Sequence, residues 1–137
     1  MPLIVRTVEY FYVNVRDEPG KAYDFLARLA SEEINILAFS AVPFGPNYVE
    51  LTIFPDQSEA FLTVAKKLGW SVTGPQHACL VQGDDRLGAL ADIQKALMDE
   101  GVKIYASTGI TDGEGHYGYI IYVNENDHQR AAKALAP

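Results

Sequence analysis

Few residues of this sequence have the types and spacing that metal chemistry needs. The three histidines, His77, His116 and His128, lie far apart along the chain and lack the close spacing of a helix-borne metal motif. We therefore predict surface or turn positions for them, and no metal or other cofactor. The single cysteine, Cys79, falls in an expected apolar strand, so we interpret it as a small core residue.

The glycine-rich segment from Gly109 to Gly118 is also a poor candidate for phosphate binding. It contains four glycines, but it lies between two expected strands and no helix follows it directly. A loop that holds phosphate needs a helix start behind it. We predict a mobile hairpin for this segment.

Two loops that combine aspartate and glycine are better candidates for binding. Asp17 precedes Gly20 by three residues, and Asp85 precedes Gly88 by the same spacing, each just before an expected helix. The first N–H groups of a helix lack internal partners and lie at its positive end, so backbone alone can hold a carboxylate there. The structural alternative is that both aspartates are helix N-caps, with Pro19 pre-organising one first turn.

These loops belong to an internal repeat. A shift of 68 residues aligns Asp17–Val42 with Asp85–Ile110 without a gap, and seven of the 26 aligned pairs are identical. The identical pairs are Asp17/Asp85, Gly20/Gly88, Asp24/Asp92, Leu29/Leu97, Glu32/Glu100, Ile36/Ile104 and Ala38/Ala106. Two copies of one unit therefore fill most of the chain.

The first copy reads as strand, helix, strand, strand, helix, strand. We expect strands at Thr7–Val15, Ile34–Val42, Tyr48–Phe54 and Trp70–Gln76. The first helix starts at Lys21 with an apolar stripe of Ala22, Phe25, Leu26, Leu29 and Ala30. The second helix has Asp56 or Ser58 as its cap, a stripe of Phe61, Leu62, Ala65 and Leu68, and Gly69 as its end. This order is the ferredoxin-like unit.

The second copy repeats the order but runs out of residues before its fourth strand. Its expected elements are strands at Ala78–Gln82, Val102–Thr111 and Gly118–Val123, a helix with the stripe Leu90, Ile93, Leu97 and Met98, and a helix at Asp127–Ala136. The 68-residue shift places Pro2–Arg6 opposite Trp70–Gly74, so we predict that residues 2–6 supply the missing strand. The predicted fold is α+β, with units at 7–76 and 77–137, antiparallel sheets and helices on one face.

Tyr10 and Tyr12 alternate with Phe11, Val13 and Val15 along the first strand. If the latter three face the helices, the tyrosines lie on a sheet face that the helices leave open. Exposed aromatic residues of this kind suggest a covering sheet or partner chain, and we predict a homodimer.

The sequence resembles the ACT domain, an amino-acid-binding regulatory module. The resemblance rests on Val15–Gly20 followed by Ala22, Phe25, Leu29 and Ile34–Ile36, and more weakly on Asp85–Gly88 with its following helix and Val102–Ile104. It covers nearly the whole chain. No catalytic domain is attached, so the chain looks like a free-standing tandem ACT protein without enzymatic activity, whose partner would be a small molecule and, in addition, a regulated enzyme.

The resemblance also implies where the ligand binds, between the first loop of one unit and the second strand of its neighbour. The implied loop residues are Asp17, Glu18, Pro19, Gly20, Lys21, Asp85, Arg86, Leu87 and Gly88, and the implied strand residues are Asn35, Ile36, Leu37, Lys103 and Ile104. Amides at a helix start would hold the carboxylate of an amino acid, and aspartate or asparagine oxygens would accept from its ammonium group. Because Lys103 replaces Asn35 in the second copy, one site, or two with different preferences, is expected.

Charge and composition limit the other possibilities. The net charge of −7 and pI near 4.8 repel polyanions, which argues against nucleic acid and against an RNA-recognition sheet that would stack bases on Tyr10 and Tyr12. No apolar run is long enough for a membrane span, and a single cysteine cannot form an internal disulfide, so we expect a cytoplasmic protein. The remaining alternative is a small-metabolite enzyme on the same scaffold, because a fold does not decide function.

Overall fold

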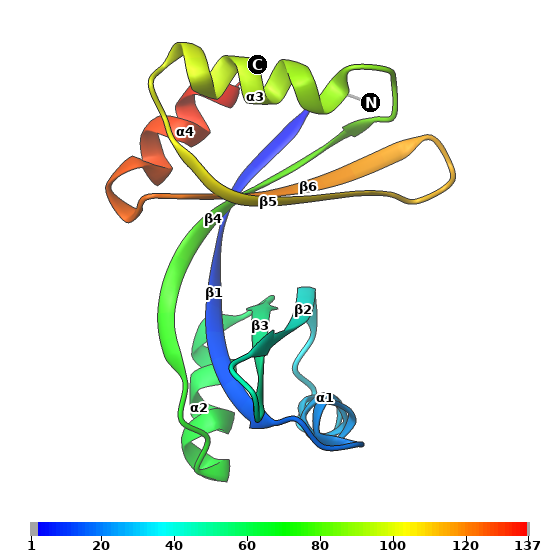
Figure 1. Ribbon diagram of the computed structural model, residues 1–137, viewed down its shortest axis with the longest axis vertical. Helices are drawn as coiled ribbons and strands as arrows, with labels where there is room; N and C mark the ends of the chain where they lie inside the picture. The colour runs from blue at the N-terminus through cyan, green and yellow to red at the C-terminus, as the bar shows by residue number, and fades with distance from the viewer. Residues whose placement is uncertain (1–2, 137) are drawn as a thin grey trace. The chain divides into compact units, whose positions relative to one another are not determined.

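The computed structural model describes residues 3–136, so the outermost positions of the predicted units, Pro2 and Pro137, lie outside the described residues (Figure 1). The elements are β1 (Ile4–Arg16), α1 (Lys21–Ser31), β2 (Ile36–Phe44), β3 (Tyr48–Pro55), α2 (Ser58–Leu68), β4 (Thr73–Asp84), α3 (Ala89–Asp99), β5 (Ile104–Thr111), β6 (His116–Val123), the short 3-10 helix η1 (Glu125–Asp127) and α4 (His128–Leu135). The strands form a six-stranded antiparallel sheet in the order β2-β3-β1-β4-β6-β5. The predicted α+β class is confirmed.

The chain divides into two compact units. One is Glu9–Gln76, called here the 9–76 unit, and the other combines the residues up to Val8 with those from His77 onward, called here the 77–136 unit. Leu3 and Val5 pack against the core of the 77–136 unit. Among residues 3–136, no helix is both long and apolar enough to cross a bilayer.

Two long strands replace four shorter ones expected from the sequence. β1 is one strand of 13 residues, and β4 is one strand of 12 residues that starts at Thr73 and continues through His77. The separate strands predicted at 2–6 and 7–15, and at 70–76 and 78–82, were therefore wrong in their boundaries. No glycine or proline lies between Ile4 and Arg16, so the sequence permits one continuous strand there, and pairing with other strands decides how far it extends.

In the 9–76 unit, both helices cover the same face of the sheet. Alternate residues of β1 and β3 point to one side, and their buried members pack with residues of α1 and α2. This core contains Phe11, Val13, Phe25, Leu29, Leu51, Ile53 and Phe61. The 77–136 unit has a corresponding core from β4, β6, α3 and α4, and it includes Cys79, which is fully buried as predicted. Burial raises the pKa of its thiol.

Several details of the predicted helices were wrong. Neither Asp56 nor Ser58 caps α2, because its N-cap is Gln57 in an extended conformation. Leu62, Leu90 and Met98 were assigned to apolar stripes but have exposed side chains, and the buried Val64 was not assigned to its stripe. Ile93 and Leu97 are buried as predicted. Residue spacing predicts which face of a helix is apolar, but it does not tell whether a residue at the edge of that face is covered by the sheet.

Tyr10 does not lie on an open sheet face. Only 6% of its surface is exposed, because its ring packs on Phe54 at 5.1 Å between centroids and its hydroxyl donates to Gln76 Oε1 at 2.9 Å. Tyr12 touches the edge of the Tyr10 ring. The 9–76 unit therefore buries Tyr10 with its own residues, and this tyrosine no longer supports a homodimer.

The two copies keep the same backbone geometry. Three features recur 68 residues apart: a left-handed glycine before the first helix (Gly20, Gly88), an N–H···O bond that closes the preceding loop (Asp17 to Asn47, Asp85 to Gly115), and a register shift early in the second strand (Ile36/Ala38, Ile104/Ala106). The sequence repeat is thus matched by a structural repeat.

Candidate functional site

Each candidate loop leads directly into a helix, and the residue before that helix has a defined backbone conformation. Gly20 and Gly88 adopt φ of 86° and 81° and occupy the N-cap positions of α1 and α3, with no side-chain cap bond at either. Neither Asp17 nor Asp85 is therefore an N-cap, which rejects the structural alternative. A residue with a Cβ is strained at such φ values, so the turn favours glycine.

A pocket of about 370 Å³ lies at the start of α3 in the 77–136 unit. We call it the loop pocket. Its lining residues are Asp85, Arg86, Leu87, Gly88, Ala89, Leu90, Ala91, Gly109, Ile110, Thr111 and Tyr117. It therefore combines the loop after β4, the first turn of α3, the end of β5 and the start of β6.

The walls of the loop pocket are largely apolar, and one glycine shapes them. Leu87 is fully exposed and Ile110 is 74% exposed, so two aliphatic side chains border the opening. A Cβ on Gly109 would lie 2.9 Å from the end of the Leu90 side chain. Leu90 therefore occupies space that any other residue at position 109 would take.

The polar groups of the loop pocket come from the backbone of the first turn of α3 and from four residues with polar side chains, Asp85, Arg86, Thr111 and Tyr117. Ala89 N donates to Arg86 O, and Asp92 N donates to Gly88 O. The amides of Leu90 and Ala91 lie between these, in the first turn, where an amide has no acceptor within its own helix. The Asp85 carboxylate adds negative charge at the same place.

Arg86 and Tyr117 are not poised for proton transfer. The guanidinium of Arg86 donates to Asp92 Oδ2 at 2.7 Å, and this hydrogen bond raises the pKa of Arg86. Burial raises the pKa of the Tyr117 hydroxyl, against the smaller lowering effect of Arg86. Both groups therefore keep their protons at neutral pH.

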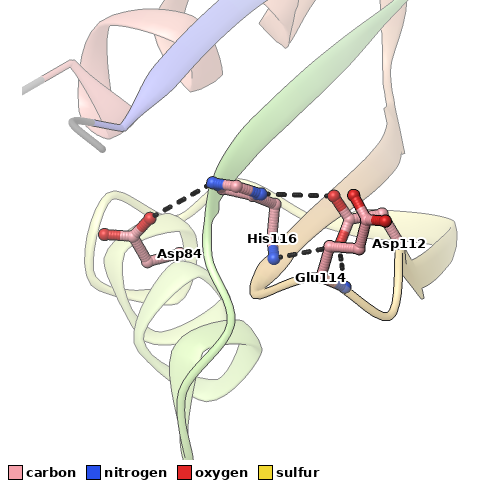
Figure 2. Close-up of polar contacts among 4 residues, drawn as sticks. All are labelled: Asp84, Asp112, Glu114 and His116. Carbon is pink, nitrogen blue, oxygen red and sulfur yellow. Dashed lines mark hydrogen bonds and ion pairs between the residues drawn. The ribbon is translucent and has the colours of Figure 1, made fainter.

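The turn between β5 and β6, next to the loop pocket, is held by Asp112 (Figure 2). Its carboxylate accepts from the backbone N–H of Glu114 at 2.7 Å and of His116 at 3.1 Å, and these bonds lower the pKa of Asp112. The His116 ring lies between two carboxylates, with Nδ1 3.2 Å from Asp112 and Nε2 4.0 Å from Asp84. The segment forms a hairpin turn rather than a phosphate loop, and His116 is exposed there as predicted.

Comparison with known proteins finds relatives in structure but not in sequence. No protein-family profile and no curated protein matches the chain. Protein BT0572 from Bacteroides thetaiotaomicron matches with a TM-score of 0.81 and 17% identity, over 96% of this chain and 88% of that chain.

Two further matches are proteins of aspartate kinase. The ligand-free regulatory subunit of aspartate kinase from Thermus thermophilus matches with a TM-score of 0.67 and 16% identity, over 96% of this chain and 93% of that chain. A structure of aspartokinase alpha and beta subunits matches with a TM-score of 0.63 and 21% identity, over 98% of this chain and 95% of that chain. The chain has an ACT-type fold. At sequence identities of 16–21%, the similarity to these proteins establishes the fold alone.

Within one ACT-type unit, the implied loop and strand residues do not meet. Arg16 pairs with Tyr48 at one end of β3, whereas Ile36 pairs with Pro55 at the other end. A strand of eight residues separates these ends by about 23 Å. The loop of Asp17, Glu18, Pro19, Gly20 and Lys21 is therefore far from Asn35, Ile36 and Leu37 in the same unit.

The same separation applies in the 77–136 unit. Asp84 pairs with His116 at one end of β6, and Ile104 pairs with Val123 at the other. Lys103 and Ile104 line a different hollow of about 290 Å³, together with Met98 and Gly101. Of the implied residues, Asp85, Arg86, Leu87 and Gly88 are brought together in the loop pocket.

Sequence reasoning missed the wall of the loop pocket that comes from the hairpin. Gly109, Ile110, Thr111 and Tyr117 line this wall, but they were assigned only to a hairpin and its strands and not to a binding site. A difference between the two copies of the sequence repeat could have pointed to this wall. Gly109 aligns with Ala41, and its contact Leu90 aligns with Ala22, so a glycine and a leucine in one copy replace two alanines in the other.

Proposed function

We propose that this protein is a regulatory protein that binds an amino acid in the loop pocket and has no catalytic activity. The observation that carries the proposal is the junction of the first turn of α3 with an apolar-walled pocket of about 370 Å³. That volume is within the range of small-molecule sites. The ACT-type fold, shared with a subunit described as regulatory, supports the same role.

The chemistry of the loop pocket fits a zwitterion with an apolar side chain. The first-turn amides of Leu90 and Ala91 would bind the carboxylate, because a helix start favours negative charge. The Asp85 carboxylate would accept from the ammonium group. The aliphatic wall formed with Ile110 would contact an aliphatic or aromatic side chain and would disfavour a charged one.

A thermal-shift screen of the twenty amino acids tests this proposal. A ligand at about 100 times its Kd should stabilise the folded chain by about 2.7 kcal/mol, which is a readable rise in Tm. We expect the largest shifts from aliphatic or aromatic amino acids. A screen in which no amino acid moves Tm would contradict the proposal.

A matched pair of glycine variants separates binding from folding. Gly88 and Gly101 both have positive φ, of 81° and 72°, and a Cβ at either position meets no atom within 4 Å. Both Gly88→Ala and Gly101→Ala should lower stability by roughly 1–2 kcal/mol through backbone strain. Only Gly88→Ala should also reduce the rise in Tm that the ligand causes. If both variants reduce this rise equally, Gly88 has a purely structural role.

The homodimer and the regulated enzyme partner remain predictions. Under the proposed function, ligand binding would change how the chain associates with a second copy or with an enzyme. Light scattering of the purified chain, with and without the amino acid found in the screen, measures the first possibility. A mass that stays that of one chain in both conditions would exclude regulation through self-association.

A further inference from the structure

Two of the three histidines come together in the 77–136 unit, although 51 positions separate them in the sequence. His77 lies in β4, Glu125 in η1, and His128 at the first residue of α4. One nitrogen or oxygen of each lies within 4.8 Å of the corresponding atoms of the other two. We propose that His77, Glu125 and His128 form a binding site for a divalent transition-metal ion such as Zn²⁺.

The carboxylate of this cluster is held against the first histidine. Glu125 Oε1 lies 2.5 Å from His77 Nδ1, and its Oε2 accepts from the His77 backbone N–H at 3.1 Å. These two contacts orient the Glu125 carboxylate before any ion binds.

The second histidine carries an unsatisfied atom. The His128 ring stacks on His77 with centroids 4.5 Å apart and an interplanar angle of 10°. Its Nδ1 is buried and has no hydrogen-bond partner among residues 3–136. An imidazole nitrogen that is buried without a partner costs free energy, so the structure leaves a lone pair or a proton here for a partner that the chain does not supply.

The donor set selects the class of ion. Two imidazole nitrogens and one carboxylate oxygen suit Zn²⁺ and its neighbours Co²⁺, Ni²⁺ and Cu²⁺, whereas Ca²⁺ and Mg²⁺ prefer oxygen ligands only. The carboxylate would offset part of the charge of a divalent cation, and each ring would donate a nitrogen lone pair to it. Three protein ligands leave a fourth position for water or another molecule.

Binding requires small side-chain rotations. Two ligands that each lie about 2.1 Å from a tetrahedral ion are roughly 3.4 Å apart, so the contact between His77 and Glu125 must open slightly. The His128 ring must also turn out of the stack, because its lone pair lies in the ring plane. The side chains of His77 and Glu125 are 28% and 48% exposed, which leaves room for these adjustments.

Titration of the full chain with ZnCl₂, followed by calorimetry, tests the proposal. We expect one ion per chain, and no comparable heat with MgCl₂ or CaCl₂. Glu125→Gln keeps the shape and an acceptor for the His77 amide but removes the charge, and His77→Ala and His128→Ala each remove a ring. Each variant should bind zinc at least about 10-fold more weakly, the smaller of the losses seen when only a supporting group is removed.

The third histidine provides the matched control. His116 lies between the carboxylates of Asp84 and Asp112 in the same unit, so His116→Ala removes an equivalent ring from an acidic surface. It should leave zinc affinity unchanged. Absence of zinc binding, binding that survives all three cluster variants, or a loss caused by His116→Ala would each overturn the proposal. None of these results depends on whether an amino acid binds the loop pocket.

Discussion

At the scale of single residues, Gly109 decides how much space the loop pocket has. A methyl group at this position would meet the end of the Leu90 side chain at 2.9 Å and the Tyr119 ring at 3.3 Å. Leu90 also lines the loop pocket, so a methyl group at position 109 would displace a side chain of the pocket wall. We predict that Gly109→Ala lowers affinity for the amino acid by about tenfold, or about 1.4 kcal/mol. Calorimetry with the amino acid identified by the screen measures this loss.

Gly118→Ala is the control for this prediction. Gly118 is also a strand glycine, and a Cβ there meets no atom within 4 Å. This variant should keep full affinity and equal or higher stability, because alanine restricts the unfolded chain more than glycine does. Equal affinity in both variants would show that the space beside Leu90 is not used by the ligand.

Asp112 makes the turn beside the pocket sensitive to acid. The pKa of this carboxyl is lowered by hydrogen bonds from the amides of Glu114 and His116, so its contribution to stability is present above its unfolded value near 3.8 and is lost as pH falls through the lower folded value. We predict faster exchange of those two amides below about pH 3.8, measured by NMR. Asp112→Asn keeps an acceptor oxygen, so it should retain the turn and abolish this pH dependence.

At the scale of elements, α3 distinguishes buried from exposed positions that are neighbours in sequence. Leu97 is fully buried in the core of the 77–136 unit, whereas Met98 is 66% exposed. Leu97→Ala should lower the free energy of unfolding by about 2–5 kcal/mol, because it removes core contacts and leaves a cavity. Met98→Ala should change it by less than about 0.5 kcal/mol. Urea denaturation compares the two, and similar losses would mean that the helix face is wrongly assigned.

At the scale of the whole molecule, β1 contributes to both units. Its residues up to Val8 belong to the 77–136 unit, where Leu3 and Val5 pack on the core, and the rest belongs to the 9–76 unit. We predict that a chain starting at Glu9 loses hydrogen-exchange protection in the 77–136 unit and keeps it in the 9–76 unit. Val5→Asp should reduce hydrogen-exchange protection in the same unit, but by less, because it places a charge where Val5 packs against the core.

The control for this prediction is the neighbouring residue. Ile4 is 41% exposed and alternates with Val5 along β1, so Ile4→Asp should leave protection nearly unchanged. A uniform loss of protection across both units in the truncated chain would mean that they unfold as one.

Much of the fold followed from local pattern. The 68-residue repeat, the start of the first helix at Lys21 and the role of Gly69 at the end of α2 could be read from turn residues and periodicity, because these signals act over a few residues. The strand boundaries in β1 and β4 could not. Whether two extended segments join into one strand depends on pairing with distant strands, which sequence spacing does not record.

The sequence by itself determined the repeated loop with its left-handed glycine and the helix that follows, since φ preferences and apolar spacing are local properties of the chain. Only the tertiary structure decided what lies around that loop. It brought Gly109 and Tyr117 beside Gly88, buried Tyr10 within its own unit and stacked His77 on His128. These residues are separated by tens of positions, and only the pairing of strands and the packing of helices make them neighbours.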